Sequence, residues 1–92
     1  MGYQIEFAPA ATKQFRKLPR GLQALLGEKI DGLSQEPRPK DAKKLSVPGR
    51  DLWRVREGDH RVVYAIRDEI LFVLVVKIGH RREVYRRLDR SR

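Results

Sequence analysis

The fold is decided by residues 51–78, which read DLWRVREGDHRVVYAIRDEILFVLVVKI. Apolar and polar side chains alternate with a period of two through residues 51–57 and again through 60–67, as they do in half-buried strands. The Gly-Asp pair between these two segments is typical of a hairpin turn. After a second turn at 68–69, residues 70–78 form an almost unbroken apolar run, which predicts a central strand covered on both faces. This stretch therefore predicts an antiparallel meander.

The residues before the meander predict one more strand and two helices. Residues 3–7 alternate like a strand. A helix opens at Ala8-Pro9, because proline is tolerated in a first turn, and Pro19 ends it. A second helix spans about residues 21–35, and the two amphipathic segments form a helical hairpin. The apolar stripes consist of Ala11, Phe15 and Leu18 in the first helix and Leu22, Leu25, Leu26, Ile30 and Leu33 in the second.

The remaining segments are polar. Residues 36–50 read as a proline-bearing connection with a short strand at Lys44–Val47. Gly79 is expected to break the apolar run, and residues 80–90 to form a polar, helical end. The fold class expected is α+β: an N-terminal strand, an antiparallel helix hairpin packed on one face of a small, mostly antiparallel sheet, and a short C-terminal helix. The chain is expected to be a single domain over residues 1–92.

Composition excludes several classes of protein. The 92 residues include no cysteine, which rules out disulfides and thiolate metal sites. Acidic residues are scattered without the spacing of a metal site, so no metal is expected. No apolar run approaches the roughly 20 residues of a membrane span, and no secretory pattern opens the chain. We therefore expect a cytoplasmic protein without a membrane partner.

Charge points to a polyanionic partner. Lys and Arg total 21 against 12 Asp and Glu, a net charge of +9. Arginines outnumber lysines by 14 to 7, and a guanidinium group can bind phosphate through two hydrogen bonds and stack on bases. The last 16 residues alone carry +5 of the net charge. This bias favours RNA or DNA, although a charge run is often only a solvated surface.

Strand alternation predicts that the candidate functional side chains share one sheet face. The opposite face receives the apolar residues Trp53, Val55, Val62, Tyr64 and Ile66. If these side chains pack on the helices, Arg54, Arg56 and Arg61 converge on the other face, and Lys77 can join them. Directly after the last strand come His80, Arg81, Arg82 and Tyr85. Cations, an imidazole and an aromatic ring are therefore expected in one concavity.

This set suits RNA cleavage, in which a 2′-hydroxyl attacks its own adjacent phosphate in line. The reaction needs a proton acceptor, cations for the phosphorane charge, and a proton for the leaving 5′-oxygen. Arginine meets the second need but is a poor proton shuttle. Tyr85 can stack on a base, and His80 has the proton chemistry suited to neutral pH. His60 alternates with Arg61 and is expected to point inward or sit in the turn, so the two histidines should face opposite ways, which argues against an acid–base pair.

Two blocks of sequence carry a family resemblance. They are residues 53–64, WRVREGDHRVVY, and residues 78–85, IGHRREVY. Both resemble the RelE branch of the RelE/ParE toxin superfamily of type II toxin–antitoxin systems. The strand at residues 3–7 and FRKLP at 15–19 fit as well, so the resemblance covers nearly the whole chain.

The resemblance implies an mRNA endonuclease that needs no metal or other cofactor and acts on messages in the ribosomal A site. It implies that Arg61 stabilises the phosphate charge, that Arg81 is the cation near the leaving oxygen, and that Tyr85 stacks on a base. Arg54 and Arg56 occupy two positions where well-known members have lysines, and His80 stands where the best-known member has a lysine. Because an arginine does not lose a proton as a lysine can, either the arginines act only electrostatically or His80 transfers a proton. Further RNA contacts are expected from Lys43, Lys44, Lys77 and Arg82.

Two other functions remain open at this point. A ParE-like toxin would share the fold and inhibit DNA gyrase without RNA chemistry. A non-catalytic nucleic-acid-binding module would use the same cations only to hold phosphate, with an affinity that falls steeply with salt. For either toxin we expect a cognate antitoxin, an acidic segment that is disordered alone and folds on binding to the basic surface.

Overall fold

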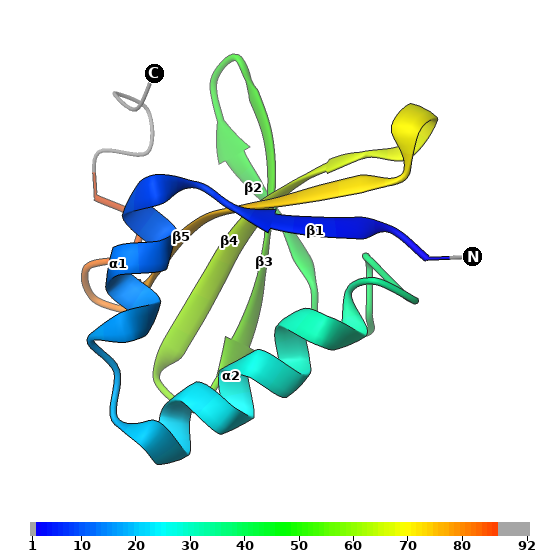
Figure 1. Ribbon diagram of the computed structural model, residues 1–92. Helices are drawn as coiled ribbons and strands as arrows, with labels where there is room; N and C mark the ends of the chain where they lie inside the picture. The colour runs from blue at the N-terminus through cyan, green and yellow to red at the C-terminus, as the bar shows by residue number, and fades with distance from the viewer. Residues whose placement is uncertain (1, 87–92) are drawn as a thin grey trace.

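The computed structural model describes residues 2–86, in which two helices pack against one face of a five-stranded sheet (Figure 1). The helices are α1 (Pro9–Arg16) and α2 (Arg20–Gly32). The strands are β1 (Gln4–Phe7), β2 (Lys43–Val47), β3 (Arg50–Glu57), β4 (His60–Arg67) and β5 (Phe72–His80), in the sheet order β1-β5-β4-β3-β2. Strand β1 pairs with β5 in parallel, and all the other pairings are antiparallel. The α+β fold with a mostly antiparallel sheet is as expected from the sequence.

The main core lies between the helices and the sheet. Strand alternation predicts the sheet side of this core, and the helical stripes predict the other side. The buried members are Ala11, Leu26, Ile30 and Leu33 from the helical segment and Val55, Val62, Tyr64, Ile66, Val73, Val75 and Ile78 from the sheet. The hydroxyl of Tyr64 donates to the carbonyl oxygen of Pro37 at 2.7 Å, so this buried ring leaves no polar group unpaired. Leu25, expected in the helical stripe, is instead half exposed.

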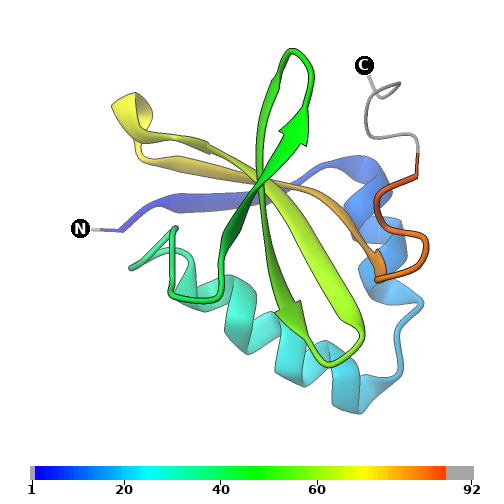
Figure 2. The same ribbon diagram turned by 180° about the vertical axis from the view of Figure 1, so that it is seen from behind.

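The sheet face away from the helices, here called the open face, is seen in Figure 2. It carries a second apolar cluster of Leu52, Val63 and Val84, all almost fully buried. Val84 comes from the segment that follows β5, which folds back over this face. Strand β5 is therefore covered on both sides, as its continuous apolar sequence predicts.

Two boundaries differ from the sequence expectation. Residues 68–70 form a short 3₁₀ turn and Leu71 has a positive φ of 51°, so β5 begins at Phe72 and runs through Gly79 to His80. The expected C-terminal helix over 80–90 is wrong for its described part, because residues 81–86 form a series of hydrogen-bonded turns. These turns place Val84 on the open face; residues 87–90 lie outside the described part of the chain. No helix within residues 2–86 has the length and apolarity to cross a membrane.

Candidate nucleic-acid interface

Cationic side chains form two neighbouring rows across the open face. In the first row the ladder aligns Lys43 with Arg54, Arg54 with Val63, and Val63 with Lys77. In the second it aligns Arg56 with Arg61, and Arg61 with Gly79. Directly paired residues share a sheet face, so these cations from four strands lie on one side. We call this set the cation patch; it consists of Lys43, Arg54, Arg56, Arg61 and Lys77.

Arg61 and Arg81 both contact residues of the turn between β3 and β4. The guanidinium of Arg61 donates to the carbonyl oxygens of Gly58 at 3.0 Å and His60 at 3.1 Å. The backbone N–H of Arg81 donates to the carbonyl oxygen of Asp59 at 2.7 Å, and its Nε lies 3.5 Å from Asp59 Oδ1. Two arginines from separate segments are thus tied to the same turn.

The segment after β5 is fixed to the open face by three kinds of contact. Val84 packs against the second apolar cluster, the Val84 N–H donates to the His80 carbonyl at 2.9 Å, and Lys77 Nζ donates to the Arg86 carbonyl. Tyr85, next to the Val84 anchor, is 40% exposed, so its ring is available for stacking. Arg82 is also exposed. A pocket of about 390 Å³ lies between this segment and α1, lined in part by Gln14, Lys77 and Glu83.

Arg54 is held at the edge of the patch by the connection before β2. Its guanidinium donates to the carbonyl oxygen of Asp41 at 2.9 Å, and the side chain is half-buried. The carboxylate of Asp41 pairs with Lys29 of α2 at 2.8 Å. Partial burial opposes ionisation of Asp41, but the hydrogen bonds from Lys29 and from the Arg56 backbone outweigh it and lower the pKa of the carboxyl group. Arg56 itself is exposed.

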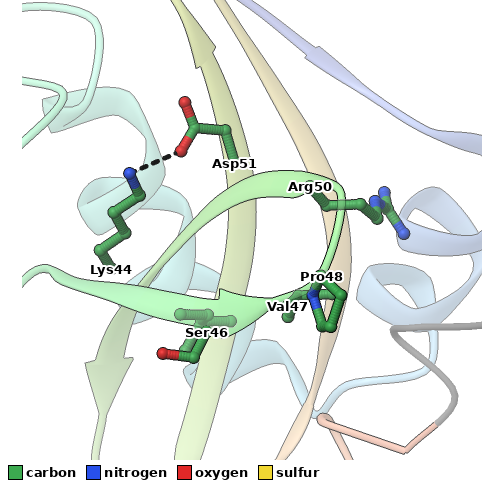
Figure 3. A pocket seen from close by; sticks show the side chains of 7 residues that line it. Lys44, Ser46, Val47, Pro48, Arg50 and Asp51 are labelled. Carbon is green, nitrogen blue, oxygen red and sulfur yellow. Dashed lines mark ion pairs between the residues drawn. The ribbon is translucent and has the colours of Figure 1, made fainter.

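Lys44 is not brought to the cation patch. It aligns with Trp53, whose side chain packs on the helix side of the sheet, so it points away from the open face. Its Nζ pairs with Asp51 Oδ1 at 2.8 Å, and this hydrogen bond lowers the pKa of Asp51. Figure 3 shows the pair at the β2–β3 hairpin, beside a pocket of about 480 Å³ that Arg50 also lines. Of the cations expected to bind RNA, Lys43 and Lys77 therefore share the arginine face and Lys44 does not.

The expectation that His60 and His80 face opposite ways is wrong. The two residues are directly paired across β4 and β5, and their rings meet edge to face with centroids 5.8 Å apart. The expectation failed because Gly79 does not end the strand and because an extra residue in β5 shifts the register near Val63 and Tyr64. A bulge of this kind re-aims side chains and leaves no dependable mark in a single apolar run.

Asp59 contacts two residues of the candidate site, and the sequence analysis gave it no part there. Its Oδ2 lies 4.0 Å from His80 Nε2, while its Oδ1 faces Arg81. On the other side of the same ring, the backbone N–H of Arg82 donates to His80 Nδ1 at 3.2 Å. The only sequence signal was the place of Asp59 in the Gly-Asp turn, which was interpreted as turn chemistry alone.

Known proteins share this mixed sheet with a helix pair on one face. The family model described as ParE toxin of type II toxin-antitoxin system, parDE, matches residues 5–85. Toxin RelG of Mycobacterium tuberculosis is 33% identical over 88 residues, which cover 95% of this chain and 100% of RelG. The mRNA interferase toxin RelE of Escherichia coli strain K12 is 31% identical over 87 residues, which cover 92% of each chain.

Solved structures agree with these sequence relatives. The archaeal RelE–RelB complex of Pyrococcus horikoshii OT3 contains a chain that aligns with a TM-score of 0.78 and 30% identity, covering 91% of this chain and 100% of that one. The isolated Escherichia coli RelE toxin aligns with a TM-score of 0.74 and 28% identity over 85% of this chain and 83% of its own. The chain therefore belongs to the RelE/ParE superfamily of type II toxins, in its RelE branch. It is related to the RelE mRNA interferase.

Proposed function

We propose that this protein is a toxin that inhibits translation by cutting mRNA in the ribosomal A site, as a metal-independent endoribonuclease of the cytoplasm. The observation that carries the proposal is that Arg61 and Arg81 are both tied to one turn, beside the segment that presents Tyr85. The names of the mRNA interferase relatives support the same activity.

The proposed chemistry is attack of a ribose 2′-hydroxyl on the adjacent phosphorus. The O2′–P bond forms as the P–O5′ bond breaks, which leaves a 2′,3′-cyclic phosphate and a 5′-hydroxyl. Arg61 stabilises the charge that develops on the non-bridging oxygens, and Arg81 stabilises the leaving oxygen. Tyr85 stacks on a base next to the scissile bond and holds the nucleotide in line. Arg54 and Arg56 add positive potential along the RNA backbone.

The four arginines of the preceding paragraph do not carry out the proton transfers, because a guanidinium group keeps its protons. His80 is the proposed proton-transfer group. It directly precedes Arg81, and its Nε2 lies 4.0 Å from Asp59 in the turn that both arginines contact. Replacement His80→Ala is expected to slow cleavage by at least about 10²-fold, the usual contribution of a general acid or base. The single-turnover rate on ribosome-bound mRNA measures this effect, and an unchanged rate would exclude the role.

The partner we propose is a cognate antitoxin. Several of the similar solved structures are toxin–antitoxin complexes, including that of Pyrococcus horikoshii. A net charge of +9 favours an acidic segment, and a segment that is disordered alone would fold as it covers the cations.

The test compares wild type, Arg61→Ala and Arg81→Ala under tight induction, with the 5′ ends of mRNA mapped in an in vitro translation reaction. Wild type should stop growth and produce cuts at A-site codons, and both variants should lose both effects. Growth arrest with DNA damage and uncut mRNA would instead indicate inhibition of DNA gyrase, the function of a ParE-like toxin. RNA binding without any product would indicate a non-catalytic binding module.

A further inference from the structure

Strands β3 and β4 part at the end of the sheet away from the β3–β4 turn. Strand β3 starts at Arg50 and β4 ends at Arg67, but the ladder between them starts with the pair Leu52 and Ala65. Beyond this pair the tips of the β2–β3 and β4–β5 hairpins point in different directions (Figures 1 and 2). A pocket of about 280 Å³ lies between them, here called the hairpin pocket, lined chiefly by Arg50, Leu52, Ala65, Arg67, Leu74 and Val76.

The floor of the hairpin pocket is apolar and lies on the open face. Leu52, Ala65 and Leu74 are aligned across β3, β4 and β5, and Val76 adjoins them. Leu52 and Ala65 belong to the second apolar cluster, which fixes the face. Leu52 is buried, whereas the other three side chains are partly exposed. Such a floor favours a ring over a phosphate, because a charged group would lose its hydration there.

The walls of the pocket are cationic. Arg50 and Arg67 lie two residues from the aligned floor pair along β3 and β4, so they share its face. Arg67 is exposed. Asp51 also lines the pocket, but its carboxylate is paired with Lys44 at 2.8 Å. A planar guanidinium group stacks on aromatic rings, so an apolar floor beside arginines suits a flat ring attached to a phosphate.

We propose that the hairpin pocket binds one unpaired base of the RNA strand that the cation patch holds. The inference rests on the proposed endonuclease function and adds a second place at which the substrate is recognised. The base lies on the apolar floor, the guanidinium of Arg67 stacks on it, and its phosphate stays outside the pocket. Unpaired RNA bases are commonly bound in this way, between apolar surface and the plane of an arginine.

The position of the pocket favours this occupant. Leu52 of the floor and Arg54 of the cation patch are two residues apart in β3, so the pocket and the patch adjoin on one face. Ala65 is four residues from Arg61 in β4, which is roughly 13 Å along a strand. A base in the pocket therefore belongs to a different nucleotide from the one beside Arg61.

The experiment compares two oligomers of equal length and charge, a 2′-O-methyl RNA that cannot be cut and its abasic counterpart. Methyl NMR spectra of wild type are recorded during titration with each oligomer. The methyl signals of Ala65, Leu74 and Val76 should shift with the RNA, because a base stacked over the floor adds a ring current. The abasic oligomer should leave these signals in place, although its phosphates still bind the cation patch.

A variant of the wall then separates stacking from charge. Arg67→Lys keeps the charge but loses the planar group, so it should weaken binding of the RNA by at least about fivefold, the low end of what stacking one base contributes. Binding of the abasic oligomer should be unchanged. Ala65→Leu, which fills the pocket from its floor, should have the same selective effect. Arg16→Lys makes the same replacement in α1, on the other side of the sheet, and should change neither affinity.

The outcomes separate this inference from the proposed function. Pocket signals that stay fixed while wild type binds RNA and cuts mRNA would overturn the pocket alone. Equal losses of both oligomers in Arg67→Lys would mean that Arg67 contacts a phosphate, which also overturns it. Shifted pocket signals with mRNA left uncut would support the base site and contradict the endonuclease. Wild type that neither binds the RNA nor cuts mRNA would contradict both.

Discussion

The carboxylate of Asp68 joins three segments of the chain through hydrogen bonds. Its carboxylate accepts two hydrogen bonds from Arg38, at 3.1 and 2.8 Å, and a third from the hydroxyl of Tyr3 at 2.7 Å. These bonds, chiefly those from Arg38, lower the pKa of Asp68 to about 2. The guanidinium of Arg38 also lies 5.1 Å from the centre of the Trp53 ring. One exposed cluster thus joins the start of β1, the connection before β2, and the β4–β5 turn.

This cluster should make stability depend on acidity. Because the folded-state pKa of Asp68 lies below the value of about 3.9 expected in the unfolded chain, its contribution is fully present above about pH 4 and declines as pH falls toward 2. Replacement Asp68→Asn should lower the melting temperature at pH 7, and the gap to wild type should narrow by pH 2. Glu69→Gln, an equal change of charge in the same turn, is the control and should leave little gap at either pH. A gap for Asp68→Asn that is equally wide at both values would contradict this account.

At the scale of single residues, the sequence predicted which sheet face a side chain occupies better than it predicted which residues that side chain contacts. Arg54 and Arg56 share a face because side chains alternate along one strand, and Arg61 joins them because the short turn pairs it with Arg56. The contact between His60 and His80 depends on how two strands are aligned, and the bulge in β5 changes that alignment. The place of Asp59 beside His80 likewise depends on the course of the chain after β5, which no local pattern specifies.

Among the elements, the β3–β4 turn has the strictest backbone requirement in the candidate site. Gly58 has a φ of 61°, a conformation that costs a residue with a Cβ about 1–2 kcal/mol. Gly79, which faces the same region, has no positive φ, and an added Cβ would lie 3.7 Å from the Val84 Cβ, an ordinary contact. The turn therefore requires glycine at position 58, whereas position 79 in β5 has room for a side chain.

Replacing each of these glycines by alanine tests the difference. Gly58→Ala should lower the free energy of unfolding by about 1–2 kcal/mol, since the left-handed backbone becomes strained. Gly79→Ala should change it by less than about 0.5 kcal/mol. Urea denaturation measures both values. Equal losses in the two variants would mean that the conformation of the turn is not what Gly58 contributes.

Element boundaries were predicted where a local signal marks them. Pro9 begins α1 as expected, and β4 has the predicted range His60–Arg67 because a turn flanks it on each side. The end of β5 was misplaced because glycine usually interrupts a strand, whereas here Gly79 continues the ladder opposite Arg61. The helix predicted after β5 rested on polar composition alone. The tertiary contact of Val84 overrides that weak preference.

For the whole molecule, the net charge of +9 governs the approach of RNA. Each phosphate neutralised on a single strand contributes about −0.7 to the slope of log affinity against log salt. Arg56→Gln, within the cation patch, should therefore make the slope shallower by about 0.7. Lys13→Gln removes the same charge from α1, on the opposite side of the sheet, and should leave the slope unchanged. Fluorescence anisotropy with an uncleavable 2′-O-methyl RNA measures the slopes, and identical changes in both variants would indicate that binding is not localised to the patch.

The sheet joins the two ends of the described chain. Strand β1, at residues 4–7, has β5, at residues 72–80, as its only partner in the sheet. During synthesis β1 therefore has no partner in the sheet until β5 has been made. The β3–β4 turn and the residues after β5 also come together only then. The pairing of β1 and the contact of Arg81 with the β3–β4 turn therefore both wait until residues 72–81 have been synthesised.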